Sequence, residues 1–242
     1  MILSRLHPIE EAIRARPREI EWVLFDSLRR DRRINDLKKL CRNARVPMRY
    51  GDAEAVARAG GSRNQGAVAR LAAREYLPEA EAFAGTRGER FLLVLDEIQD
   101  PQNLGAILRV AEAVGATVVL PERGSAPMSE AVARSSAGAV ERVPVVRVGN
   151  LRRFVDRLKD QGFRVIGLDP SGESIYGLDL SGDLALVLGA EGKGIRRLVR
   201  EGCDLVARLP MKGRVASLNV AAAASAAAFE TLRQRGVSVK NS

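Results

Sequence analysis

The sequence predicts an α/β fold whose C-terminal part contains a parallel β-sheet. Phe91–Leu95 and Leu184–Leu188 are short runs of apolar residues only, which is typical of strands buried on both faces. From Phe91 onward such strands alternate with helical patterns, and this alternation indicates a parallel sheet. Two late apolar segments also run into polar, glycine-bearing loops, and ligand crevices in α/β folds are built from such loops.

The N-terminal residues predict a smaller α/β domain. A helix begins near His7, with Pro8 at its first position, and Ile34–Ala44 has the apolar spacing of an amphipathic helix. The other expected elements here are strands at Ile20–Phe25, Pro47–Tyr50 and Gly66–Ala72 and a short helix at Ala53–Ala59. We expect this domain to span residues 1–73. Residues 74–90 are acidic, alanine-rich and punctuated by glycine, which favours a linker, and residues 91–242 form the second domain.

The second domain is expected to follow a regular order of strands and helices. Asn103 can cap a helix that ends at Gly115, and Arg109 lies on a different face of this helix from Leu104, Leu108 and Ala111. Ser217 or Asn219 is available to cap a long alanine-rich helix. The elements between are strands at Thr117–Leu120, Val143–Val148, Phe163–Leu168 and Leu205–Met211 and helices at Ser129–Ala137 and Leu151–Gln161.

The composition excludes several functional classes. No apolar run approaches the roughly 18 residues that cross a bilayer, and the N-terminus lacks the apolar core of a signal peptide, so we expect a cytoplasmic protein with no membrane partner. Cys41 and Cys203 are far apart and predict neither a disulfide framework nor a zinc site. His7 is the only histidine, which excludes a histidine metal site and a Ser-His-Asp triad. We therefore expect no metal cofactor.

The charge balance points to a polyanionic partner. Lysine and arginine number 39 against 30 acidic residues, a formal net charge of +9. Between Arg29 and Arg49 there are nine basic and only two acidic residues, a density that favours phosphate contact over an ordinary solvated helix face. Aromatic residues make up only 4% of the chain, so base stacking on aromatic side chains is a weak hypothesis.

Two common readings of glycine loops fail. A phosphate-binding P-loop requires serine or threonine after its lysine, but Lys193 is followed by Gly194. The dinucleotide fingerprint requires glycines after the first strand, but Leu95 leads into Asp96 and Glu97.

Three motifs in order carry a stronger signal. They are Asn103-x-Gly105-x-x-x-Arg109, the loop Leu188-Gly189-Ala190-Glu191-Gly192-x-Gly194, and Leu209-Pro210-Met211 followed by Ser217-Leu218-Asn219. In this order and spacing the sequence over Phe91–Arg235 resembles the SPOUT class of RNA methyltransferases, specifically the SpoU/TrmH-type ribose 2′-O-methyltransferases. The N-terminal segments Leu6–Ala12 and Arg63–Ala69 resemble the L30e-like substrate-binding domain of the bacterial 23S rRNA guanosine 2′-O-methyltransferases. That family usually has His-Gln-Gly in the second segment, where this chain has Asn64.

The resemblance implies a fold, a cofactor and partners. The C-terminal domain would contain a deep trefoil knot, and the protein would be a homodimer with its active site near the subunit interface. S-adenosylmethionine would be the methyl donor, and rRNA, not DNA, the nucleic-acid partner. The cofactor-binding residues would be Leu188, Gly189, Gly192, Leu209, Met211 and Leu218.

The resemblance also implies roles for five polar residues. Arg109 is the family's activator of the ribose 2′-hydroxyl. Because a guanidinium stays protonated, we favour a role in binding the adjacent phosphate and stabilising the forming alkoxide over a role as base. Asn103 and Asn219 would orient the site, although helix capping explains each equally well. Glu191 would hold Arg109 or the cofactor loop, or be a solvent-exposed turn residue, and Ser217 would bind in the site or cap the long helix.

Two competing interpretations remain open at this point. The same chemistry could act on a tRNA loop, although the N-terminal domain argues against the compact tRNA enzymes. The second interpretation is a non-catalytic RNA-binding factor for ribosome assembly. The presence of all five polar motif residues counts against it: Asn103, Arg109, Glu191, Ser217 and Asn219.

Overall fold

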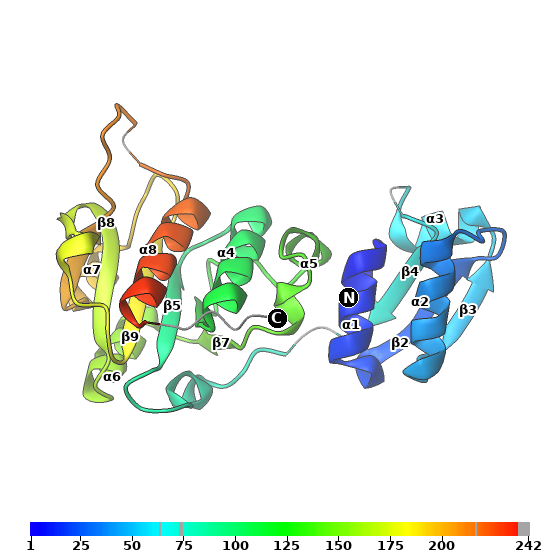
Figure 1. Cartoon of the computed structure of the whole chain (residues 1–242), viewed down its shortest axis with the longest axis horizontal. Coiled ribbons are helices and arrows are strands. Elements are labelled where there is room, and N and C mark those ends of the chain that lie inside the picture. The colour runs from blue at the N-terminus through cyan, green and yellow to red at the C-terminus, as the bar shows by residue number, and fades with distance from the viewer. Residues whose placement is uncertain (63, 73–74, 216, 237–242) are drawn as a thin grey trace. The chain divides into compact units, whose positions relative to one another are not determined.

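The structure is a computed structural model that describes residues 1–62, 64–72, 75–215 and 217–236. The chain forms two compact units (Figure 1). Unit 1 consists of Met1–Glu75 and Pro127–Arg142, and unit 2 of Tyr76–Ala126 and Val143–Ser242. The predicted boundary at residues 73 and 74, like Arg63 of the second N-terminal segment, lies outside the described residues.

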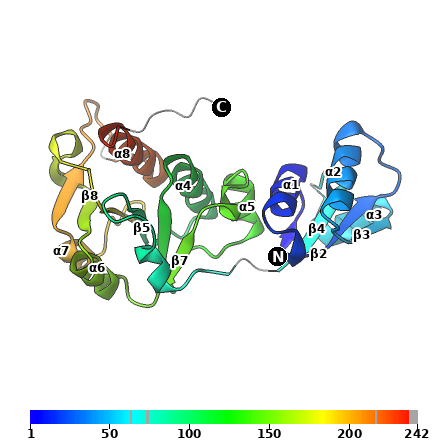
Figure 2. The same ribbon diagram turned by 60° about the horizontal axis from the view of Figure 1, so that its bottom comes forward.

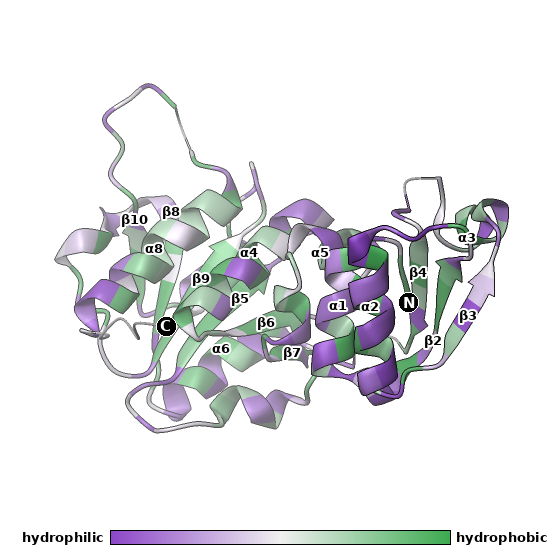
Figure 3. Ribbon diagram, turned by 45° about the vertical axis from the view of Figure 1, so that its right-hand side comes forward, coloured by the Kyte–Doolittle hydropathy of each residue, from purple (hydrophilic) through white to green (hydrophobic). Residues whose placement is uncertain are grey.

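Unit 1 is built on a four-stranded sheet with the order β1-β4-β2-β3. Its strands are β1 (Ile2–Leu3), β2 (Ile20–Asp26), β3 (Met48–Gly51) and β4 (Ala67–Leu71), and its first helices are α1 (Leu6–Ala15), η1 (Pro17–Glu19), α2 (Arg32–Asn43) and α3 (Ala53–Gly60). The predicted amphipathic pattern of α2 is confirmed, because Ile34, Leu37 and Cys41 are buried and Asp31 caps the helix by accepting a hydrogen bond from the Ile34 amide. In Figure 3 much of the ribbon of this helix is purple, the colour of hydrophilic residues.

Unit 1 also contains a segment from the middle of the chain, with α5 (Glu130–Ser135) and η3 (Ala139–Glu141). The Glu130 carboxylate accepts hydrogen bonds from the amide and hydroxyl of Ser4. Arg16 makes a two-pronged ion pair with Glu141, at 2.6 and 3.2 Å. The sequence analysis assigned these residues to the second domain. The difference arises from a hydrogen bond and an ion pair between residues more than 120 positions apart, which no local pattern reveals.

Unit 2 is built on six parallel strands with the order β10-β8-β9-β5-β6-β7. Its strands are β5 (Phe91–Asp96), β6 (Thr117–Pro121), β7 (Val145–Val148), β8 (Arg164–Ser174), β9 (Leu184–Gly189) and β10 (Leu205–Arg208). The predicted parallel α/β sheet is therefore confirmed, and the fully apolar β5 and β9 are adjacent and buried on both faces. Two strand lengths were predicted wrongly: β8 runs past Leu168 to Ser174, and β10 ends at Arg208.

Helices cover both faces of this sheet. α4 (Pro101–Val114) and α8 (Val220–Gln234) pack side by side on one face, while α6 (Leu151–Asp160) and α7 (Arg197–Gly202) lie on the other (Figures 1 and 2). The short helices η2 (Glu79–Phe83) and η4 (Ile175–Gly177) complete the unit. Leu92 and Val94 of β5 face the α6 side, where Phe154 and Leu158 join them in one apolar cluster. Figure 3 shows the strands of this sheet in green, the colour of hydrophobic residues.

Part of the predicted linker is packed against unit 2. Ala82 of η2 is buried, and the Phe83 ring lies 5.8 Å from the ring of Phe154. The Leu77 amide donates a hydrogen bond of 2.8 Å to the carbonyl of Val145, at the edge of the sheet. Apolar residues scattered in an acidic segment thus anchor it, which the composition did not indicate.

The predicted cap of α8 is confirmed, whereas that of α4 is wrong. Asp100, not Asn103, caps α4, because its carboxylate accepts a hydrogen bond from the Gln102 amide and the helix begins at Pro101. Asn219 caps α8 by accepting hydrogen bonds from the amides of Ala221 and Ala222. Within the described ranges, no helix is long and apolar enough to cross a bilayer. The trefoil knot and the L30e-like character of unit 1 remain predictions.

Candidate functional site

A cavity of about 260 Å³ lies in unit 2 beside the carboxyl ends of β9 and β10 and the middle of β8, at Leu168, Asp169 and Pro170. Parallel strands place their carboxyl ends at the same edge of a sheet, so the loops that follow them converge there. All six residues predicted to bind a cofactor line this cavity: Leu188, Gly189, Gly192, Leu209, Met211 and Leu218. Glu191 and Ser217 also line it.

The loop after β9 folds tightly back on itself. The Gly194 amide donates a hydrogen bond of 2.8 Å to the Ala190 carbonyl, and Gly192 and Gly194 adopt φ values of +78° and +68° that favour glycine. A Cβ on Gly189 would lie 2.0 Å from the carbonyl carbon of Gly194. Gly189 is therefore required by the close approach of the loop's own backbone, whereas the sequence analysis attributed it to the approach of a ligand.

An ion pair holds this loop against the neighbouring strand. Asp96 ends β5, lies opposite Gly189 in the strand register, and is fully buried. Its carboxylate accepts hydrogen bonds from the amide and the Nε of Arg196, at 2.8 and 2.7 Å. The sequence analysis did not select either residue. The available signal was a carboxylate placed directly after a fully apolar strand.

A chain of side-chain hydrogen bonds joins the three sequence motifs. The Nδ2 of Asn219 donates to the Oδ1 of Asn103 at 2.9 Å, and the Nδ2 of Asn103 donates to Glu191 Oε2 at 3.3 Å. The first turn of α4, the cap of α8 and the loop after β9 therefore meet beside the cavity. Ser217 lines the cavity and does not cap α8, because Asn219 holds that position.

Arg109 stands apart from this chain. It is exposed on α4, with no hydrogen bond or ion pair to any residue that the structure describes. Six positions separate it from Asn103, which places the two side chains about 120° apart around the helix. The structure thus brings Asn103, Glu191 and Asn219 together but leaves Arg109 free to meet a partner outside this chain.

Four charged residues line the cavity: Asp169, Glu191, Lys193 and Arg208. A hydrogen bond from the Ser171 hydroxyl is the main cause that lowers the pKa of the Asp169 carboxyl, and burial opposes it. Asp169 is therefore ionised at neutral pH.

The two cysteine thiols are poor nucleophiles near neutral pH. Burial raises the pKa of the Cys41 thiol to about 12 and that of the Cys203 thiol to about 11. Neither forms much of the thiolate that acts as a nucleophile near neutral pH. No three His, Cys, Asp or Glu side chains gather as metal ligands among the residues described.

Two models of protein families match this chain. The model of the SpoU rRNA methylase family matches residues 90–229, and the model of the RNA 2′-O ribose methyltransferase substrate-binding domain matches residues 6–77. The chain is a member of the SpoU rRNA methylase family, which confirms the resemblance seen in the three motifs.

Similar proteins cover nearly the whole chain. The 23S rRNA (guanosine-2′-O-)-methyltransferase RlmB of Ralstonia nicotianae is 42% identical over 98% of this chain and 96% of its own. The protein of the same name from Pseudomonas aeruginosa is 38% identical over 95% of each chain. The crystal structure of the SpoU methyltransferase AviRb from Streptomyces viridochromogenes, in complex with its cofactor AdoMet, has the same fold. It matches with a TM-score of 0.81 at 23% identity, over 97% of this chain and 89% of that one.

Proposed function

We propose that this protein transfers a methyl group from S-adenosylmethionine to the ribose 2′-hydroxyl of a guanosine in 23S rRNA. The observation that carries the proposal is the hydrogen-bonded chain Asn219–Asn103–Glu191, which joins all three family motifs beside one cavity. The relatives named as 23S rRNA guanosine methyltransferases match both units, which supports the same substrate class here. An rRNA substrate places the activity in the cytoplasm.

The cavity wall fits the proposed cofactor. Leu188, Leu209 and Val220 offer apolar surface for a nucleoside base, and the exposed glycine loop offers backbone groups for hydrogen bonds. The Asp169 carboxylate offers a negative charge to a cationic ligand. When bound, S-adenosylmethionine supplies an electrophilic methyl group on a positively charged sulfur.

The residues of this chain act mainly by positioning. The hydrogen bond between Asn219 and Asn103 holds the start of α8 to the first turn of α4, and the hydrogen bond between Asn103 and Glu191 holds the loop after β9 to the same turn. Arg109 binds the phosphate next to the target ribose and stabilises negative charge that develops on the 2′-oxygen. Methyl transfer requires an in-line approach of oxygen to carbon, so such positioning supplies much of the rate.

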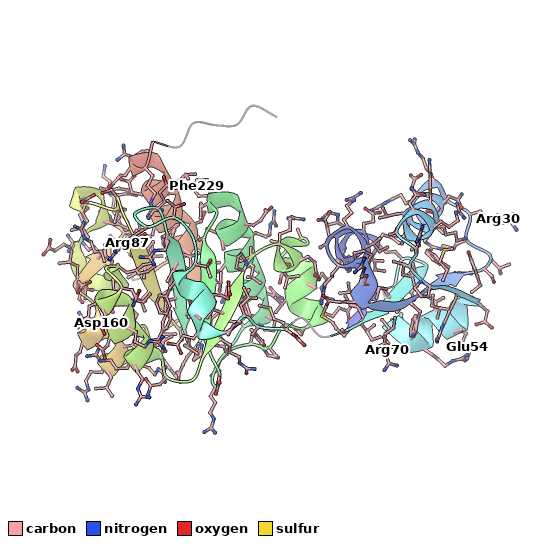
Figure 4. All side chains as sticks on the ribbon, turned by 90° about the horizontal axis from the view of Figure 1, so that it is seen from below. Arg30, Glu54, Arg70, Arg87, Asp160 and Phe229 are labelled. Atoms are coloured by element: carbon pink, nitrogen blue, oxygen red, sulfur yellow. The ribbon has the colours of Figure 1, made fainter. Side chains whose placement is uncertain are left out.

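We also propose that the active form is a homodimer. Large apolar side chains are exposed in the cavity wall, with Leu218 41% and Met211 37% exposed, and farther along α8, with Phe229 48% exposed. Phe229 lies on α8, beside α4 with its unpaired Arg109 (Figure 4). Exposed apolar patches of this kind are typical of protein interfaces. A second copy would cover Phe229 and complete the surroundings of Arg109.

The N-terminal unit would bring rRNA to the site. Its α2 and the loop before it present Arg29, Arg30, Arg32 and Arg33 on the surface, all exposed, and Arg30 is labelled in Figure 4. Basic side chains contact phosphates, and added salt weakens such contacts steeply. We expect the affinity for rRNA to fall with salt concentration.

The test incubates purified protein and tritiated S-adenosylmethionine with unmodified 23S rRNA transcript, and separately with a tRNA pool. The modified position is mapped by resistance to alkaline cleavage, which requires a free 2′-hydroxyl. Label at one alkali-resistant guanosine of 23S rRNA supports the proposal. Label only on tRNA would overturn the substrate, and an absence of both label and cofactor binding would favour the non-catalytic RNA-binding factor.

A further inference from the structure

Asp169 lines the cavity and lies outside the three motifs described above. It follows Leu168, the last residue of β8 that pairs with β9, and therefore stands at the carboxyl edge of the sheet. The glycine loop after β9 lies opposite, because a Cβ on Gly194 would lie 3.5 Å from the Oδ2 of Asp169. This side chain thus lies between the middle of β8 and the loop.

The two carboxylate oxygens of Asp169 differ in their partners. Oδ1 accepts hydrogen bonds from the amide and the hydroxyl of Ser171, at 2.9 and 2.5 Å. The Ser171 hydroxyl in turn accepts a hydrogen bond of 2.8 Å from Arg200. Oδ2 has no hydrogen-bond partner among the residues that the structure describes. One oxygen therefore fixes the orientation of the group, and the other remains available to a ligand.

Asp169 also differs from the other charged residues of the wall. Glu191, Lys193 and Arg208 are exposed, and Glu191 is already bonded to Asn103. Asp169 is half-buried, so salt and water screen its charge less. The hydrogen bond from the Ser171 hydroxyl lowers the pKa of this carboxyl further below neutrality, so the group carries a full negative charge at neutral pH. It is the best-placed negative charge for a cation in the cavity.

We propose that the Asp169 carboxylate binds the cationic methyl donor and makes the site prefer S-adenosylmethionine over S-adenosylhomocysteine. This inference rests on the proposed function. The donor carries a positive sulfonium, whereas the demethylated product has a neutral thioether at the same place. A fixed negative charge attracts the first more than the second, and the preference favours exchange of product for new donor after each transfer.

The test measures the dissociation constants of both ligands by calorimetry, for the wild type and for Asp169→Asn, which keeps the shape of the side chain and removes its charge. We expect S-adenosylmethionine to bind the variant about tenfold more weakly and S-adenosylhomocysteine to lose much less affinity. Asp179→Asn is the matched control. Asp179 makes the same turn, with its Oδ1 accepting from the amide and hydroxyl of Ser181, but it does not line the cavity. We expect this control to bind both ligands as the wild type does.

Two further measurements keep the proposal falsifiable if Asp169→Asn folds poorly. Ser171→Ala removes the hydroxyl that orients the carboxylate but keeps the charge and the hydrogen bond from the amide of residue 171, so the variant should keep a preference for the methyl donor that is smaller than that of the wild type. In the wild type, added salt should weaken binding of the donor more than that of the product. An equal loss for both ligands in Asp169→Asn, or no loss for either, would overturn the role of the charge. Because these are binding measurements, a wild type that binds neither ligand would contradict the proposed function itself.

Discussion

The side-chain amide of Asn219 donates a hydrogen bond of 2.9 Å to the carbonyl oxygen of the Asn103 side chain, across 116 positions of the chain. The side-chain oxygen of Asn219 is also bonded, because Asn219 Oδ1 accepts hydrogen bonds from the first amides of α8. One asparagine therefore caps a helix and links two motifs, so the alternatives of capping and site orientation are both realised in this residue.

Substitution of Asn219 separates its two roles. Asn219→Asp keeps an oxygen for the cap but loses the donor to Asn103, so we expect near-normal stability and methyl transfer slowed by about tenfold to a hundredfold. Asn219→Ala loses both and should also lower the free energy of unfolding by about 1 kcal/mol. Chemical denaturation and the tritium assay measure the two effects. Asn150, which caps α6 in the same way, is the control: Asn150→Asp should change neither quantity much. Full activity in Asn219→Asp would contradict the orienting role.

Arg109 should matter for activity and not for stability. It is exposed and unpaired among the described residues, so Arg109→Ala should unfold at the wild-type denaturant concentration. Loss of a group that stabilises developing charge costs about a hundredfold to a thousandfold in turnover. Arg109→Lys keeps a positive charge but loses the bidentate fork, and should recover only part of the rate. Arg153, exposed on α6, is the matched control. Near-normal turnover by Arg109→Lys would contradict a role that depends on guanidinium geometry.

Two glycines of the cofactor loop should tolerate alanine to different degrees. In Gly189→Ala the new methyl group would collide with the backbone of Gly194, so the loop must move and cofactor affinity should be lost. Gly192 has open space around it and only a positive φ, so Gly192→Ala should cost about 1–2 kcal/mol of strain. Gly177, with open space and no positive φ, is the control. Calorimetric titration with S-adenosylmethionine measures the affinity of each variant and so ranks the three substitutions. Equal affinity in the Gly189 and Gly192 variants would show that backbone crowding is not the reason for Gly189.

Asp183 should contribute stability that depends on pH. It is buried, which raises a carboxyl pKa, but hydrogen bonds from the side chain and amide of Arg90 and from the Gly88 amide outweigh this and lower it. A depressed pKa in the folded state means that the stabilisation is complete above the ordinary aspartate value of about 4 and is lost as the pH falls below it.

The variant Asp183→Asn tests this. It leaves Arg90 buried without its partner, so we expect a loss of about 3 kcal/mol at pH 7. The difference in the free energy of unfolding between the variant and the wild type, measured by urea denaturation, should shrink as the pH falls below about 4. The control is Asp160→Asn, at an exposed site (Figure 4). A difference that stays constant down to pH 2 would contradict the assignment of this pH dependence to Asp183.

Much of the fold followed from local patterns. The apolar runs of β5 and β9 predict buried parallel strands because a strand covered on both faces needs apolar residues at every position. The spacing of α2 and α6 predicts their buried faces for the same reason of periodicity. Errors gathered where tertiary contacts decide the outcome. Pro127–Arg142 packs in unit 1 through ion pairs with Arg16 and Glu11, and η2 is anchored by the ring of Phe83.

The sequence by itself determined the class of fold, the family and the residues of the three motifs, because these depend on residue types at short spacing. Only the tertiary structure decided which of those residues meet. It joined Asn219, Asn103 and Glu191 by hydrogen bonds and left Arg109 at the surface. It also added the ion pair between the buried Asp96 and the exposed Arg196, which holds the glycine loop. The physical reason is that a side-chain contact depends on distance and direction in space, and strand order and loop path set both.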